Sequence, residues 1–103
     1  MIDLSKISGF EWDRGNSDKN VKKHGVTQRE AEQLFLDPGL QVEKDIKHQE
    51  VEKRFIAIGK TADNTMLFGA FTLRRDKIRI ISIRLANKRE RRLYEQENTK
   101  KNS

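Results

Sequence analysis

The sequence contains no cysteine, only one proline and no long hydrophobic run. Without cysteine the chain has no disulfide, no thiolate nucleophile and no cysteine-ligated zinc site, which suits a reducing compartment. No segment approaches the roughly 18 consecutive apolar residues of a membrane-spanning helix, and residues 1–9 are too short and too polar for a secretory signal peptide. We therefore expect a soluble, cytoplasmic protein with no membrane contact.

The sequence also lacks the patterns of metal and nucleotide-cofactor sites. Its two histidines, His24 and His48, fall in different predicted elements and no cluster of carboxylates accompanies them, whereas a metal site needs several such ligands together. The six glycines occur singly, so no glycine-rich loop is present to cradle a phosphate. We expect neither a metal nor a cofactor.

Positive charge is what the sequence has in excess, and it is unevenly distributed. The chain of 103 residues has a net charge of +6, but residues 72–92 hold nine lysines and arginines and only two acidic residues. This segment therefore carries a charge of +7, and the rest of the chain carries −1. A local positive field favours a polyanion or an acidic partner protein, and the alternative is a solvated basic helix face.

Hydrophobic periodicity predicts a single α+β domain over residues 1–103, since the chain is too short for two. The predicted order is β-α-α-β-β-β-β-α, with strands at 10–12, 41–45, 54–59, 66–73 and 78–85, and helices at 13–24, from 27 to the turn at 37–39, and from 87 onward. Short connections between consecutive strands predict an antiparallel meander. We expect two N-terminal helices packed on an antiparallel sheet of four to five strands, then a basic C-terminal helix, with a core at about 10–97 and a flexible tail at 98–103.

Two pairs of residues predict where helices begin. Thr27 and Glu30 have the spacing of a capping box, in which each side chain satisfies the other residue's backbone amide. Asn87 and Glu90 repeat this spacing after the last predicted strand. The second pair therefore predicts that a strand passes directly into a helix rich in arginine.

The last predicted strand, residues 78–85, is rich in isoleucine but contains two arginines. The strand period of two places Ser82 and Arg84 on one face, and Arg79 and Ile83 on the other. Because Ser82 is small and polar, we expect a site beside Arg84 at the end of this strand.

A basic surface that bears Arg, Lys, His, Glu and Tyr permits cleavage of RNA without a metal. The RNA supplies its own nucleophile, the 2′-hydroxyl, so the protein needs a proton acceptor, a proton donor and cations that stabilise the developing charge. Arginine suits the last task because its planar fork contacts two phosphate oxygens, and DNA lacks the required hydroxyl. By themselves the residues predict a basic α+β domain that binds RNA, with cleavage permitted.

The order of several short motifs resembles that of the BrnT family, the toxins of BrnT/BrnA type II toxin–antitoxin modules. The matching residues are Phe10, Glu11, Trp12, Asp13, Asn20, Lys23, His24, Gly25, Val26, Ala31, Phe35, Arg54, Gly59, Ile78 to Arg84, Ala86, Lys88, Glu90, Arg91 and Tyr94. The resemblance implies a RelE-like fold, metal-independent endoribonuclease activity that inhibits translation, and neutralisation by a BrnA-like antitoxin that also binds operator DNA. Ile83 departs from the pattern, because the family usually has a small residue there.

The residues and the resemblance together define a candidate site. The catalytic candidates are Arg84, Arg54, His24, Tyr94 and Glu90. The RNA-binding candidates are Lys23, Arg79, Lys88 and Arg91. Structural alternatives stay open: Arg84 can pair with a carboxylate such as Glu90, Arg54 can form a cross-strand ion pair, His24 can interact with a helix dipole, and Tyr94 can be an aromatic at the core edge.

Two other functions also stay open. A non-catalytic RNA-binding or ribosome-associated module would bind RNA without cutting it. A pure interaction subunit would use the basic C-terminal helix only to receive an acidic partner.

Overall fold

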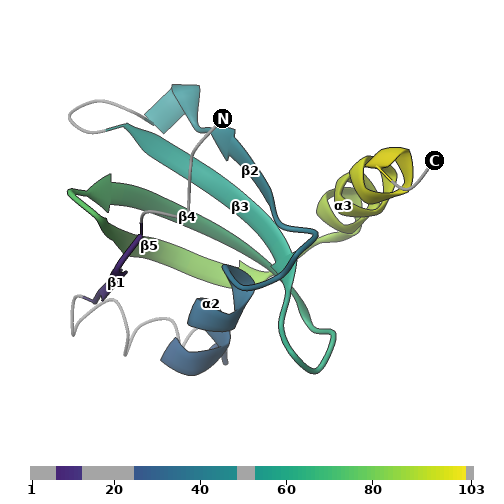
Figure 1. Cartoon of the computed structure of the whole chain (residues 1–103). Helices are drawn as coiled ribbons and strands as arrows, with labels where there is room; N and C mark the ends of the chain where they lie inside the picture. The colour runs from purple at the N-terminus through teal and green to yellow at the C-terminus, as the bar shows by residue number, and fades with distance from the viewer. Residues whose placement is uncertain (1–6, 13–24, 49–52, 102–103) are drawn as a thin grey trace.

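The computed structural model describes residues 7–12, 25–48 and 53–101 (Figure 1). Its elements are β1 (Gly9–Glu11), α2 (Gln28–Leu34), β2 (Gln41–Lys44), the 3-10 helix η2 (Ile46–His48), β3 (Arg54–Lys60), β4 (Met66–Arg74), β5 (Lys77–Leu85) and α3 (Lys88–Lys101). The α+β class and the five predicted strands are confirmed. The helix predicted at residues 13–24 lies outside the described residues.

The five strands form one sheet in the order β1-β5-β4-β3-β2. The antiparallel meander predicted for β2 to β5 is confirmed. However, β1 runs parallel to β5, with Phe10 opposite Ile78, so the sheet is mixed and the prediction of a purely antiparallel sheet is wrong. Short hairpins force neighbouring strands to be antiparallel, whereas β1 is joined to β5 through most of the chain and no turn constrains its direction.

Helix α2 covers one face of the sheet. The predicted capping box is present at its start, where the Glu30 amide donates to the Thr27 hydroxyl (3.2 Å) and the Thr27 amide donates to the Glu30 carboxylate (3.1 Å). Ala31 and Leu34 are fully buried. Leu34 packs over the backbone of β3, where a Cβ added to Gly59 would lie only 2.8 Å from Leu34 Cδ1. The close approach of α2 to the sheet therefore depends on glycine at this position.

A β-bulge in β5 decides which of its side chains face the core. Ile80 and Ser82 are opposite two consecutive residues of β4, so Ile81 is an extra residue in β5. An extra residue reverses the alternation of side chains beyond it. Ile83 is accordingly buried together with Ile80, while Ser82 is exposed.

The bulge corrects the predicted positions of the two arginines of β5. Arg79 is opposite Thr72, and Arg84 is opposite Phe68. Because Thr72 and Phe68 are four residues apart on β4, both arginines lie on the same face of the sheet. The prediction that they face opposite sides is wrong, since it assumed a strand without a bulge.

Helix α3 follows β5 directly and is attached to the loop between α2 and β2 (Figure 1). The hydroxyl of Tyr94 donates to Asp37 Oδ2 (2.7 Å). The side-chain amide of Asn98, which the sequence placed in the tail, donates to the carbonyl of Gly39 (3.1 Å). Asp37 also accepts from the backbone amide of Lys60 (2.8 Å), so one carboxylate joins α3, the loop and β3.

Within the described ranges, no helix has the length and apolar composition needed to cross a membrane. The same residues contain no group of three or more His, Asp or Glu side chains placed to hold a metal ion.

Candidate functional site

Arg54, Arg79 and Arg84 lie on the sheet face opposite the core. Arg54 of β3 is opposite Thr72 of β4, and Thr72 is opposite Arg79 of β5. Neighbouring strands are about 4.8 Å apart, so the backbones of Arg54 and Arg79 are separated by about 10 Å. Arg84 lies farther along β5 on the same face. We call this surface, composed of Arg54, Thr72, Arg79, Ser82 and Arg84, the arginine face.

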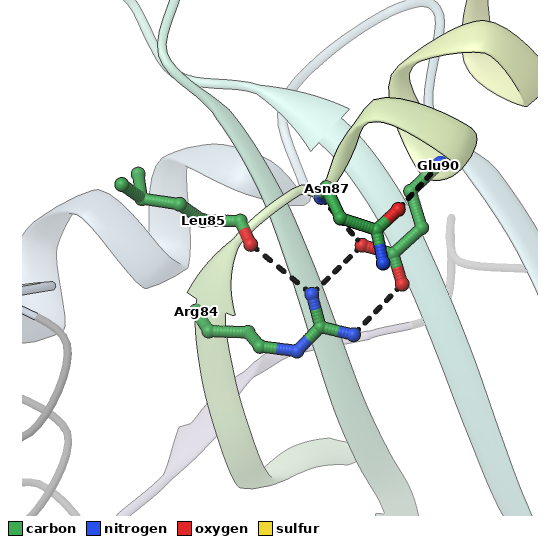
Figure 2. A network of polar contacts seen from close by, with 4 residues as sticks. All are labelled: Arg84, Leu85, Asn87 and Glu90. Carbon is green, nitrogen blue, oxygen red and sulfur yellow. Dashed lines mark hydrogen bonds and ion pairs between the residues drawn. The ribbon is translucent and has the colours of Figure 1, made fainter.

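Arg84 forms a bidentate ion pair with Glu90 of α3. Its Nη1 and Nη2 atoms each lie 2.8 Å from a different carboxylate oxygen of Glu90 (Figure 2). Nη1 also donates to the carbonyl of Leu85 (3.1 Å), and the guanidinium lies 4.2 Å from the centre of the Phe68 ring. The Arg84 side chain nevertheless remains 37% exposed, so an anionic ligand can approach it from solvent.

Glu90 is positioned by the first turn of α3. The Asn87 amide donates to the Glu90 carboxylate (2.8 Å), and the Glu90 amide donates to the Asn87 side-chain oxygen (2.9 Å), which confirms the predicted capping box. Burial raises the pKa of Glu90, but hydrogen bonds from Arg84 and Asn87 outweigh burial, and the pKa is lowered overall. The hydrogen bond to Glu90 raises the pKa of Arg84. The pair is therefore ionised at neutral pH, and Glu90 is a weak proton acceptor.

Arg54 is only partly satisfied by its neighbours. Its Nε atom lies 3.5 Å from Asp45 Oδ2, which is an ion-pair distance. This buried N–H nevertheless makes no hydrogen bond within the part of the chain that the structure describes. Buried donors are nearly always paired, and each exception calls for an explanation such as a functional role. The ion pair weighed as the structural alternative for Arg54 is thus present, but it leaves one donor unused.

Tyr94 does not present its hydroxyl to the arginine face. Only 6% of the residue is exposed, and its hydroxyl donates to Asp37 in the loop after α2. Burial, together with the hydrogen bond to Asp37 and its negative charge, raises the pKa of Tyr94 to about 12. The ammonium of Lys60 lies 5.4 Å from the ring centre. These contacts are those of a residue that attaches α3 to the fold.

The remaining candidates lie at the margin of this site or outside the described residues. Lys88 and Arg91 are exposed on the first turn of α3. Lys23 and His24 belong to the segment that the structure does not describe. Of the five catalytic candidates, the structure brings Arg54 and Arg84 to one face and joins Glu90 to Arg84.

Sequence reasoning did not identify three residues that the structure connects to the candidates. Phe68 lies beneath Arg84, and although alternation along β4 assigns it to a face, only the strand register places it there. Asp45 pairs with Arg54. Asp37 was interpreted only as part of a turn, because its partner Tyr94 is 57 positions away.

The fold and the arginine face define a small basic α+β protein whose open sheet surface is suited to a polyanion. A family model described as the ribonuclease toxin BrnT of type II toxin–antitoxin systems matches residues 12–90, and the chain belongs to this family. The resemblance seen in the sequence is thereby confirmed.

A solved structure supports the same fold. The crystal structure of the Brucella abortus ribonuclease toxin BrnT is similar with a TM-score of 0.60 and 22% sequence identity, over 78% of this chain and 97% of that chain. At this identity the likeness shows a shared fold. No curated protein sequence matches the chain.

Proposed function

We propose that this protein is a metal-independent endoribonuclease toxin that binds its RNA across the arginine face. The family to which the chain belongs is described as a ribonuclease toxin. The observation that carries the proposal is the bulge in β5, because it places Arg79 and Arg84 on the same face as Arg54. Three guanidinium groups on one open face supply cations for the phosphates of a single RNA strand.

In the proposed reaction the 2′-hydroxyl of one nucleotide attacks the adjacent phosphorus. The bond to the 5′-oxygen of the next nucleotide breaks, which leaves a 2′,3′-cyclic phosphate and a free 5′-hydroxyl. Arg84 stabilises the charge that develops on the phosphorane, and Arg54 and Arg79 hold the flanking backbone. Proton transfer is assigned to His24, whose ordinary pKa of about 6.5 suits both directions, with Lys23 beside it binding RNA.

Glu90 and Tyr94 take positioning roles in this proposal. The lowered pKa of Glu90 and its two hydrogen bonds with Arg84 support a carboxylate that orients the guanidinium. The raised pKa of Tyr94 and its bond to Asp37 support a structural hydroxyl. Lys88 and Arg91 extend the positive surface onto α3.

The proposal includes the setting of a BrnT toxin. The protein acts in the cytoplasm on messenger or other cellular RNA and thereby inhibits translation, and its fold is RelE-like. A BrnA-like antitoxin neutralises it by covering the arginine face and the start of α3, and attaches the complex to operator DNA. The concentration of positive charge between residues 72 and 92 supports such a partner.

Cleavage of RNA in excess EDTA tests the proposal. We expect the free toxin to cut a single-stranded RNA and to leave 2′,3′-cyclic phosphate ends, whereas the same RNA with 2′-O-methyl groups stays intact. Activity that vanishes with chelator and returns with magnesium would contradict the mechanism.

A second candidate function is RNA binding without cleavage. The engagement of Arg84 by Glu90 favours it, since the ion pair occupies the guanidinium edge that would face a phosphate. If the protein binds both the unmodified RNA and the 2′-O-methyl RNA and cuts neither, this alternative is established.

A further inference from the structure

A groove of about 320 Å³ lies between α3 and the sheet, on the side of the arginine face. Its apolar lining comes from Ile56 and Ile58 of β3, Phe68 of β4 and Leu93 of α3. Leu93 is 45% exposed although it is a large apolar side chain. The groove is therefore an open apolar slot and not a closed part of the core.

The groove is continuous with the arginine face through two residues. Phe68 lines the groove, and the guanidinium carbon of Arg84 lies over its ring, 4.2 Å from the ring centre. Glu90, which also lines the groove, holds the same guanidinium by two hydrogen bonds (Figure 2). A strand whose phosphate contacts Arg84 would thus have its neighbouring base at the mouth of this slot.

The rim of the groove differs in charge from the arginine face. Glu43 of β2 and Glu97 of α3 line it together with Glu90, so its carboxylates outnumber its arginine, Arg89. Carboxylates repel a phosphate, but they accept hydrogen bonds from the exocyclic amino group of a base. Uracil places a carbonyl oxygen where cytosine has its amino group, so the same carboxylates disfavour uracil.

We propose that this groove binds one nucleobase of the RNA, next to the phosphate held by Arg84, and selects bases that carry an exocyclic amino group. The apolar slot accepts the ring faces, and Glu43, which is exposed and lies opposite Ile56 in the sheet, accepts from the amino group. The inference rests on the proposed function in taking RNA as the ligand of the arginine face. It adds a specificity site to that face.

Binding of uncleavable RNA isolates this site from catalysis. We would measure the fluorescence anisotropy of labelled 2′-O-methyl hexacytidylate and hexauridylate with the full chain. These pyrimidine oligonucleotides have equal charge, and we expect the cytidine strand to bind at least about fivefold more tightly, the lower end of the discrimination by a well-placed base contact.

Two groove variants have matched controls elsewhere on the surface. Glu43→Gln and Leu93→Ala should each bring the ratio of the two affinities close to one. Glu95→Gln makes the same charge change on the exposed side of α3, and Leu36→Ala removes a leucine that is 78% exposed beside α2. Both controls should leave the ratio at its wild-type value.

The outcomes separate this inference from the proposed function. Equal binding of the two strands, or a ratio of affinities that either groove variant leaves at its wild-type value, overturns the base site even if unmodified RNA is cut. If both groove variants bring the ratio of affinities close to one but the protein cuts no RNA, the base site is upheld and the nuclease activity is overturned. If Leu93→Ala weakens binding of an antitoxin and leaves the ratio unchanged, the occupant is a protein and the base site is overturned.

Discussion

Arg84 and Glu90 join the end of β5 to the first turn of α3 through two hydrogen bonds of 2.8 Å. The same carboxylate closes the capping box with Asn87. The Glu90 carboxylate therefore contributes to the start of the helix, to its contact with the end of β5 and to the orientation of the arginine. Any change that neutralises Glu90 should affect all three.

The first prediction concerns acid. The folded-state pKa of Glu90 is lowered from its ordinary value of 4.5, so the pair stabilises the fold above that value and this contribution is lost as the pH falls through the lowered pKa. Asp37, whose pKa is also lowered, acts in the same direction. We expect the free energy of unfolding of the wild type to fall between about pH 5 and pH 3. Glu90→Gln should lose about 1 kcal/mol at pH 7, a value discounted for the exposure of Arg84.

Urea unfolding at several pH values checks this prediction. In acid, the free energy of unfolding of Glu90→Gln should change less with pH than that of the wild type. Glu95→Gln, an exposed substitution on the same helix, should show the same pH dependence as the wild type. A Glu90→Gln curve parallel to the wild-type curve would show that the ion pair does not contribute to the acid response.

The second prediction distinguishes a transition-state arginine from one that only binds. Arg84→Ala should lower RNA cleavage by about 100- to 1000-fold, the scale for removal of one preorganised donor, with a much smaller loss of RNA affinity. Arg79→Ala should chiefly weaken binding and reduce its dependence on salt.

Single-turnover cleavage and binding at several salt concentrations separate the two effects. Because Arg84→Ala leaves Glu90 without its partner, the double variant Arg84→Ala/Glu90→Gln serves as control, and it should regain stability without regaining activity. Equal effects of the Arg79 and Arg84 variants on both measurements would place the transition-state residue elsewhere, at Arg54 or His24.

The third prediction concerns Tyr94. Tyr94→Phe removes the hydrogen bond to Asp37 and should lower the free energy of unfolding by about 1 kcal/mol. Cleavage, measured well below the melting temperature, should stay within about twofold of the wild type, since a structural hydroxyl supplies no proton to the reaction. A variant with wild-type stability and lost cleavage would instead make Tyr94 a proton donor.

The fourth prediction tests the contact between α2 and the sheet. Gly59→Ala places a methyl group 2.8 Å from Leu34 Cδ1 and 3.2 Å from the Leu34 carbonyl oxygen, and should destabilise the protein by about 1–3 kcal/mol. Gly9→Ala is the matched control, because a Cβ there meets nothing within 4 Å. Thermal melting of both variants measures the effect. Equal melting temperatures would show that α2 moves to accommodate the methyl group with no loss of stability.

Local patterns in the sequence predicted much of the fold. Both capping boxes depend on residues three positions apart, and local residue patterns, among them the alternation of apolar residues at 10–12 and 54–59, predicted a strand at each of the five places where the sheet has one. The partner of β1 could not be predicted, because nothing between Glu11 and Lys77 in the sequence specifies whether these distant strands run parallel. The bulge at Ile81 could not be predicted either. One extra residue moves every later side chain to the other face of the sheet, but the residues of the strand remain typical of any strand.

The candidate site was predicted less completely than the fold. Residue type and motif identified Arg84, Arg54 and Glu90. The ion pair of Arg84 with Glu90 was the structural alternative to a role of Arg84 in the site. The common face of Arg54 and Arg79 follows from the register of three strands, which depends on tertiary packing. The contact between Arg84 and Phe68 depends on the same register.

The parallel pairing of β1 with β5 sets the order in which the sheet can be completed during translation. Gly9–Glu11 is made early, but its partner strand Lys77–Leu85 is made after all the other strands. The hairpins of β2, β3 and β4 are local and can form first. Strand β1 can pair only after β5 has been made. Arg79 and Arg84 emerge with β5 itself. A chain interrupted before that strand therefore carries an unfinished sheet that lacks Arg79 and Arg84, and only a polypeptide extended through β5 acquires the surface on which its proposed toxicity depends.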